Sequence, residues 1–251
     1  MLRCDTGRAF SIGTFCMAGL VFLLVGGFSN LDKIQAVLEN ARPLEAGWTV
    51  TFVSETLKSE ACLLLIPFLS ALPFSASFVE EWQSGMIRLL AGRVDKGSYL
   101  FSKAVAAALA GGLILVFGAL FLILGALLAF LPLEKGAAEP VLLEEGIRDL
   151  SMLVLRYFLC GALWAEVGLL CSAWLNHRYL AYLSPFMADY LLVILHERYV
   201  EGLTLLYPKE WILADRQWPW DGWSLAAWLL ALIALTGAAF ITIGKERLNC
   251  V

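Results

Sequence analysis

Two acidic residues lie inside long apolar stretches of the sequence, where a charged group is costly. Glu166 falls in the stretch 150 to 174, and Asp189 falls in the stretch 179 to 195. Counted at about 1.5 Å per residue from the facing ends of these stretches, the two carboxyls come to similar depths. Two acids at one level could share a proton, pair with a cation or line a wet cavity. The alternative is that each is hydrogen-bonded locally and has only a structural role.

The apolar stretch 59 to 79 holds further candidates for a translocation path. Pro67 and Pro73 each leave a backbone carbonyl without its usual helical partner, and Ser70 and Ser75 carry hydroxyls nearby. A kinked helix lined by hydroxyls suits a moving wall of such a path. The same pattern is also the ordinary way in which a helix in lipid tolerates proline.

Sequence patterns of common catalytic and metal sites are missing. The two histidines, His177 and His196, lie at the ends of apolar stretches, and the chain contains no GxSxG or HExxH motif. No CxxC spacing occurs among the six cysteines, Cys4, Cys16, Cys62, Cys160, Cys171 and Cys250. We therefore interpret the cysteines as free thiols packed as small apolar residues, and we expect neither a metal site nor catalysis by this chain.

The composition predicts a membrane protein. Of the 251 residues 60% are hydrophobic and 16% are charged, against about 45 to 50% and about 25% in soluble domains. The net charge of -4 argues against binding to nucleic acid. A chain of this length has room for about six spans but not for an additional nucleotide-hydrolysing domain.

We expect an all-α membrane protein with a single transmembrane domain over residues 1 to 251. The spans should lie near residues 9 to 28, 59 to 79, 101 to 131, 150 to 174, 179 to 195 and 223 to 244. The fifth is short and contains Pro185. Close helix packing in the third is predicted by its small residues, Ala104, Ala108 and Gly112, with Ala107 and Gly111 beside them.

The distribution of Lys and Arg predicts the orientation. Lys and Arg are denser in one set of segments, 1 to 9, 80 to 103, 175 to 178 and 245 to 251, than in the set on the opposite side, 29 to 58, 132 to 149 and 196 to 222. The positive-inside rule then places the denser set, and both termini, in the cytoplasm.

Two of the outer segments carry structural signals. In the first, Asn30 is typical of a helix N-cap, and we expect a short amphipathic helix that stops before Pro43. The last, residues 196 to 222, is rich in Trp and Tyr. We expect it to dip partly into the outer leaflet before the sixth span, although a plain aromatic belt would give the same composition.

The cytoplasmic segment FVEEWQSGMIRLLAGRVDKGSYLFSK, residues 78 to 103, interrupts two apolar stretches. Apolar residues recur at helical spacing at Trp82, Met86, Leu89 and Leu90, which predicts an amphipathic helix over about 81 to 94. Such a helix could lie on the anionic inner leaflet. Because it is tethered to a span at each end, it could also act as a lever for a partner that grips it.

The continuation EEWQSGMIRLLAGRVDKGSYLFSKAVAAAL resembles the signature that follows the second span of ATP-binding-cassette (ABC) type-2 permeases. The similarity is specific over residues 78 to 110, and elsewhere it is one of topology. The resemblance implies that this helix is a coupling helix, which docks in a groove of a separate ATPase subunit. The implied coupling residues are Glu80, Glu81, Trp82, Gln83, Ser84, Gly85, Met86, Ile87, Arg88, Leu90 and Arg93.

The same resemblance implies the partners. ATP and Mg would be bound by two copies of the ATPase subunit, so we expect no cofactor in this chain. A second permease half, either the same chain or a sibling, and membrane lipid complete the expected assembly. Its setting would be a cell membrane, of a bacterial exporter for antibiotics or peptides or for immunity to them.

The leading hypothesis is therefore a permease subunit of an ATP-driven ABC exporter for an amphipathic substrate, such as a peptide, an antibiotic or a lipid-like molecule. The alternative is a proton-coupled secondary transporter, independent of ATP, that uses Glu166 and Asp189 as its relay. The chain shows no convincing inverted repeat, which transporters of that class often have.

Overall fold

The computed structural model describes residues 12–40, 44–87, 95–134, 140–199, 204–214, 218–219 and 222–249. Within these ranges the chain is nearly all helical, and the β pairing consists of one isolated bridge between Leu44 and Glu134. The elements in chain order are α2 (Ile12–Ser29), α3 (Leu31–Asn40), α4 (Trp48–Leu57), α5 (Glu60–Ala71), α6 (Ser77–Gln83), α8 (Lys96–Phe130), η1 (Leu131–Leu133), α9 (Pro140–Leu175), α10 (Arg178–Arg198), η2 (Thr204–Leu206), α11 (Pro208–Leu213) and α12 (Trp223–Asn249). The predicted all-α class is confirmed.

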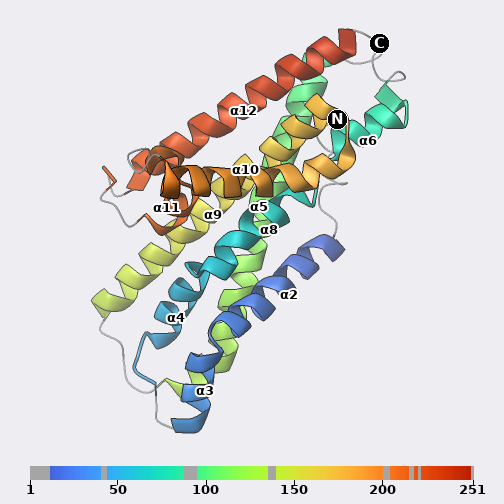
Figure 1. The fold of residues 1–251 in the computed structure, drawn as a ribbon. Helices are drawn as coiled ribbons and strands as arrows, with labels where there is room; N and C mark the ends of the chain where they lie inside the picture. Colours follow the sequence, from blue (N-terminus) through green and yellow to red (C-terminus); the bar gives the residue numbers. More distant parts are fainter. Residues whose placement is uncertain are drawn as a thin grey trace.

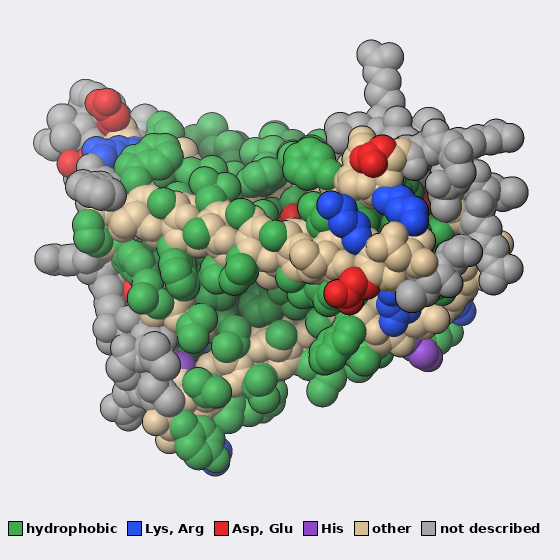
Figure 2. Space-filling view, turned by 90° about the horizontal axis from the view of Figure 1, so that it is seen from above, with side chains coloured by type: hydrophobic (Ala, Val, Ile, Leu, Met, Phe, Trp, Pro, Cys, Tyr) green, Lys and Arg blue, Asp and Glu red, His purple; other side chains and the backbone are tan. Residues whose placement is uncertain are grey.

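Among the described residues, five helices are long and apolar enough to cross a membrane, namely α2, α8, α9, α10 and α12. They overlap the first, third, fourth, fifth and sixth predicted spans, and residues 9–11 of the first lie outside the described ranges. Figure 2 shows hydrophobic side chains over the middle of one face and charged side chains gathered toward its two ends. This distribution fits a belt facing hydrocarbon, and the chain is a membrane protein.

The second predicted span, 59 to 79, is not one helix. α5 ends at Ala71, residues 72–76 form turns, and α6 begins at Ser77. Pro73 accounts for the break, because proline has no N–H and disfavours helical geometry in the residue before it. With 12 residues, α5 covers about 18 Å, which is less than the hydrocarbon thickness of about 30 Å. α4, α5 and α6 follow one another along the bundle in Figure 1.

α8 and α9 pack closely at the centre of the bundle. A Cβ added to Gly111 of α8 would lie 2.3 Å from the Ala165 Cβ and 2.7 Å from the Gly161 carbonyl oxygen of α9. Such contacts are shorter than atoms tolerate, so only glycine permits this approach of the two backbones. The close packing predicted from the small residues of the third span is confirmed at Gly111.

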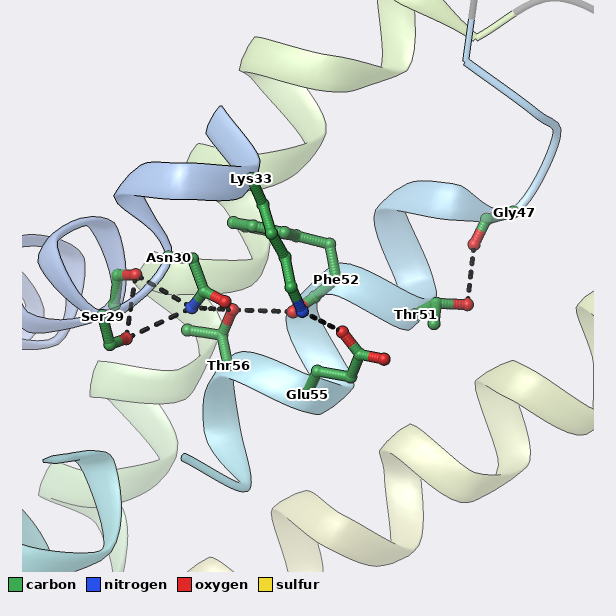
Figure 3. Close-up of polar contacts among 9 residues, drawn as sticks. Ser29, Asn30, Lys33, Gly47, Thr51, Phe52, Glu55 and Thr56 are labelled. Atoms are coloured by element: carbon green, nitrogen blue, oxygen red, sulfur yellow. Dashed lines mark hydrogen bonds and ion pairs between the residues drawn. The ribbon is translucent and has the colours of Figure 1, made fainter. Parts of the chain in front are cut away.

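A polar cluster joins α2, α3 and α4 at one end of the bundle (Figure 3). The Asn30 side-chain amide donates to the Thr56 hydroxyl oxygen at 3.0 Å and to the Gly26 carbonyl at 3.2 Å. The predicted helix after Asn30 is confirmed as α3, although the Asn30 side chain joins it to α4 instead of capping it. Lys33 and Glu55 form an exposed ion pair beside this cluster.

Glu134 caps α4 from a distant part of the sequence. Its carboxylate accepts hydrogen bonds from the Gly47 N–H at 3.2 Å, the Thr49 N–H at 2.7 Å and the Thr49 hydroxyl. Burial raises the pKa of Glu134, but the three hydrogen bonds together outweigh it and hold the pKa below its ordinary value. A carboxylate at a helix N-terminus satisfies free N–H groups and faces the positive end of the helix dipole.

Candidate functional site

The candidate site is the junction where α6 meets the first turns of α8 and the last turns of α9 and α12. α6 is only seven residues long, too short to be stable without tertiary contacts. Its position is fixed from the turn that precedes it, because the Ser75 hydroxyl donates to the Ala165 carbonyl at 3.0 Å. The Ser172 hydroxyl donates to the Ser75 carbonyl at 3.1 Å. Both bonds join the turn to α9.

A buried ion pair joins α6 to α8. The Glu81 Oε1 atom lies 2.8 Å from Lys103 Nζ, and the Lys103 side chain has no exposed surface. The Tyr99 hydroxyl donates to Glu81 Oε2 at 2.5 Å. The Lys103 ammonium also lies 4.8 Å from the centre of the Phe74 ring, a cation–π contact. Glu81 therefore points into the protein.

The end of α6 also contacts α9 and α12. The Gln83 amide donates to the Asn176 carbonyl at 3.1 Å. The guanidinium of Arg247 lies 5.9 Å from the centre of the Trp82 ring, and it donates to the Trp174 carbonyl at 2.6 Å. Four helices thus meet at this junction, which surrounds a hydrophobic core that includes Phe78 and Phe240.

The structure divides the predicted coupling helix. Glu81, Trp82 and Gln83 belong to α6, and the chain then turns at Gly85, whose φ of 73° favours glycine over residues with a Cβ. Helical geometry resumes at Met86 and Ile87. Ile87 is buried and Met86 is exposed, so the buried face differs from the one predicted. Arg88, Leu90 and Arg93 lie outside the described residues.

A shallow cavity of about 390 Å³ lies beside the junction. Its lining includes Glu80, Ser84 and Met86 of the predicted coupling residues, together with Tyr182 of α10. Glu80, Gln83, Ser84 and Met86 are exposed. These four described coupling residues are therefore the ones that a partner protein can reach directly.

Three of the candidate translocation-path residues of α5 and the following turn, Pro67, Ser70 and Ser75, pack inward, whereas Pro73 is half-buried and lines the shallow cavity beside the junction. Ser70 and Ser75 are fully buried. The Ser70 hydroxyl donates to the Pro67 carbonyl of its own helix at 3.1 Å, and Pro67 itself is buried within α5. In this conformation the hydroxyls satisfy backbone groups, which is the second of the two interpretations of the Pro/Ser pattern.

Glu166 and Asp189 lie near different cavities. Glu166 lines a groove of about 510 Å³ between α8, α9 and α12, where it accepts a hydrogen bond from the Thr236 hydroxyl at 2.7 Å. Asp189 lines a cavity of about 490 Å³ between α5, α9, α10 and α11. Leu159 and Ala162 of α9 line the first, whereas Cys160 and Trp164 line the second. The two acids are therefore separated by α9.

Lys103 and Tyr99 are functional candidates that the sequence analysis did not single out. The available signal was the lysine itself, because a Lys in an apolar, Ala-rich helix needs a partner of opposite charge. Its partner was one of two adjacent glutamates, Glu80 or Glu81, and only the structure shows which of them faces α8.

The described cysteines, Cys16, Cys62, Cys160 and Cys171, are free thiols, as predicted. Cys62 and Cys160 are buried as expected, Cys171 is half-buried, and Cys16 is exposed. Cys4 and Cys250 lie outside the described residues.

The chain matches no protein-family model, and no curated protein matches it. The resemblance to ABC type-2 permeases therefore rests on the sequence of residues 78 to 110.

Proposed function

We propose that this chain is the membrane subunit of an ATP-driven ABC exporter and that a separate ATPase subunit docks on the segment between α6 and α8. The observation that carries the proposal is the buried pair of Glu81 and Lys103. It joins the helix before the segment to the helix after it. A force applied to the segment therefore reaches α6 and α8 together, and the contacts of Trp82 and Gln83 pass it on to α12 and α9.

In this proposal the junction faces the cytoplasm. α4, α5 and α6 together make one further crossing of the membrane, in addition to the five made by α2, α8, α9, α10 and α12. The break between α5 and α6 is compatible with a membrane interior because the Ser172 hydroxyl donates to the Ser75 carbonyl there. An interrupted crossing can change its bend at the turn without unfolding, which suits an element that transmits movement.

The segment before α12 supports the expected dip into the outer leaflet. Trp211 of α11 is buried, and its ring centre lies 6.1 Å from that of Trp164. Trp164 lies eleven residues before the end of α9 at Leu175, a distance of about 16 Å along the helix. With Leu175 at the cytoplasmic surface, α11 reaches well into the membrane.

A second permease half binds this chain in the proposed assembly. The proposed substrate is amphipathic. α10 exposes Leu183, Met187 and Leu191, a surface suited to lipid or to a second membrane helix. The proton-relay alternative has less support, because Glu166 and Asp189 line cavities on opposite sides of α9.

The proposal is tested by purification from the native host. We expect the chain to co-purify with a nucleotide-binding subunit, and we expect ATP hydrolysis in that complex but not in the isolated chain. The charge changes Met86→Glu and Arg88→Glu, introduced together, should abolish the association. Lys33→Glu, a charge reversal at an exposed position of α3, at the opposite end of the bundle from α6 (Figure 1), is the control and should leave the association intact. Retention of the ATPase by the double variant would overturn the proposal.

A further inference from the structure

The cavity between α5, α9, α10 and α11 has the size and lining of a small-molecule site. Its volume is about 490 Å³, within the range of about 300 to 1,000 Å³ found for ligand pockets. Leu63 and Ile66 of α5, Trp164 of α9, Val193 of α10 and Ile212 of α11 contribute apolar walls. Because several helices supply these walls, the cavity belongs to the folded bundle and not to a surface loop.

One carboxyl group of this cavity, that of Asp189, has no hydrogen-bonded partner, although the charge of Lys209 acts on it from a distance. Asp189 is 9% exposed, and it makes no hydrogen bond or ion pair with any residue that the structure describes. An acid in such surroundings is unfavourable unless a cation or a donor reaches it. By contrast, Glu166, a buried acid of α9, is bonded to Thr236.

The other charged groups of the cavity leave Asp189 without a bonded counter-ion. Lys209 Nζ lies 3.2 Å from a carboxylate oxygen of Glu60 and 3.2 Å from one of Glu197. The ammonium is thus shared between two carboxylates at the rim. With Arg198, the lining holds three acids and two bases, so its formal charges favour a cation over an anion.

We propose that this cavity binds an organic cation with an apolar body, and that the Asp189 carboxylate holds its ammonium group. The aromatic ring of Trp164 and the aliphatic walls contact the body of the ligand. This site stands independently of the proposed function, because it requires neither ATP nor a partner subunit.

The test uses the full chain purified in detergent and the fluorescent amine dansylcadaverine as the probe. The N-pentyl dansyl amide, which has the same fluorophore and the same five-carbon chain but no terminal ammonium, is the control ligand. We expect saturable binding of dansylcadaverine, and binding of the N-pentyl amide that is weaker by about 10-fold or more, as the loss of a charge-assisted hydrogen bond predicts. Equal binding of the two probes, or no saturable binding of dansylcadaverine, would overturn the proposal.

Matched variants locate the site. Asp189→Asn should weaken binding of dansylcadaverine by about 10- to 100-fold, whereas Glu166→Gln, which changes the acid on the other side of α9, should leave it within about 2-fold. Val193→Trp fills the cavity without a change of charge and should also abolish binding. Leu191→Trp, on an exposed part of the same helix, should not. Unchanged binding by Val193→Trp would contradict the site even if Asp189→Asn failed to fold.

The two proposals fail separately. Loss of the amine site leaves the association with an ATPase untouched, and loss of that association leaves binding to the isolated chain untouched.

Discussion

The Glu81 carboxylate and the Lys103 ammonium lie 2.8 Å apart between α6 and α8, in surroundings from which water is nearly excluded. Each charge has lost most of its hydration, so each depends on the other. The Tyr99 hydroxyl donates a hydrogen bond to the second oxygen of the Glu81 carboxylate. The two helices that flank the proposed docking segment are therefore joined at its base.

Removal of one member of the Glu81–Lys103 pair should lower the stability of the fold far more than removal of both. We expect Lys103→Met to lower the free energy of unfolding by about 3 to 5 kcal/mol, because it removes the ammonium that faces a buried carboxylate. Addition of Glu81→Gln to this variant should restore part of the loss. Thermal and denaturant unfolding of the purified chain measure both effects.

The control for this prediction is Lys33→Met, which removes the exposed pair with Glu55. Exposed pairs contribute about 0 to 1 kcal/mol. A loss of stability in Lys103→Met no larger than that in Lys33→Met would show that the buried pair does not hold the junction.

The close approach of α8 and α9 leads to a second prediction, which concerns the stability of glycine variants. Gly111→Ala places a methyl group 2.3 Å from Ala165 Cβ and should cost about 1 to 3 kcal/mol as the helices separate. Gly27→Ala is the matched control, because its added methyl group meets no atom within 4 Å. That substitution should be neutral or should stabilise α2 by up to about 1 kcal/mol. Equal melting temperatures of the two variants would contradict the packing described for α8 and α9.

The sequence predicts the long helices well because their apolar content and length are local properties. α12, for example, begins at Trp223, where the sixth span was expected. Depth can also be counted along a helix, and this count led to the pairing of Glu166 with Asp189. The count carries no information about the neighbours that each helix face meets, and the structure shows that the two acids lie on different sides of α9.

The junction itself was only partly predictable. The pattern of residues 82 to 90 suggested one continuous helix, but a positive φ at Gly85 ends α6 before Met86. The break at Pro73 follows a local rule, yet whether a proline kinks or ends a helix depends on partners for the freed carbonyls. The Ser75 carbonyl, in the turn after Pro73, has such a partner in Ser172, which lies far away in the sequence.

The Glu134 cap predicts a dependence of stability on pH. Its pKa is below the ordinary value, so the folded chain favours the ionised form. The stabilisation is complete above the pKa that Glu134 has in the unfolded chain, and it is lost as the pH falls through the lowered pKa of the folded chain. At neutral pH, Glu134→Gln should cost about 1 kcal/mol.

The difference between Glu134→Gln and the parent chain should disappear under acidic conditions. Unfolding measured across a pH series checks this, with Glu45→Gln, an exposed acid in the loop before α4, as the control. A constant difference at every pH would show that the charge of Glu134 does not contribute to the cap.

The central claim, that an ATPase docks on the segment after α6, is tested most directly by site-specific photocrosslinking in native membranes. A benzophenone side chain is placed at Met86, which is 37% exposed at the junction, and at Met187 of α10 as the control. We predict that Met86 crosslinks to a subunit with a nucleotide-binding P-loop and that Met187 does not. Crosslinks from Met86 to lipid alone, or to proteins without such a loop, would contradict the account.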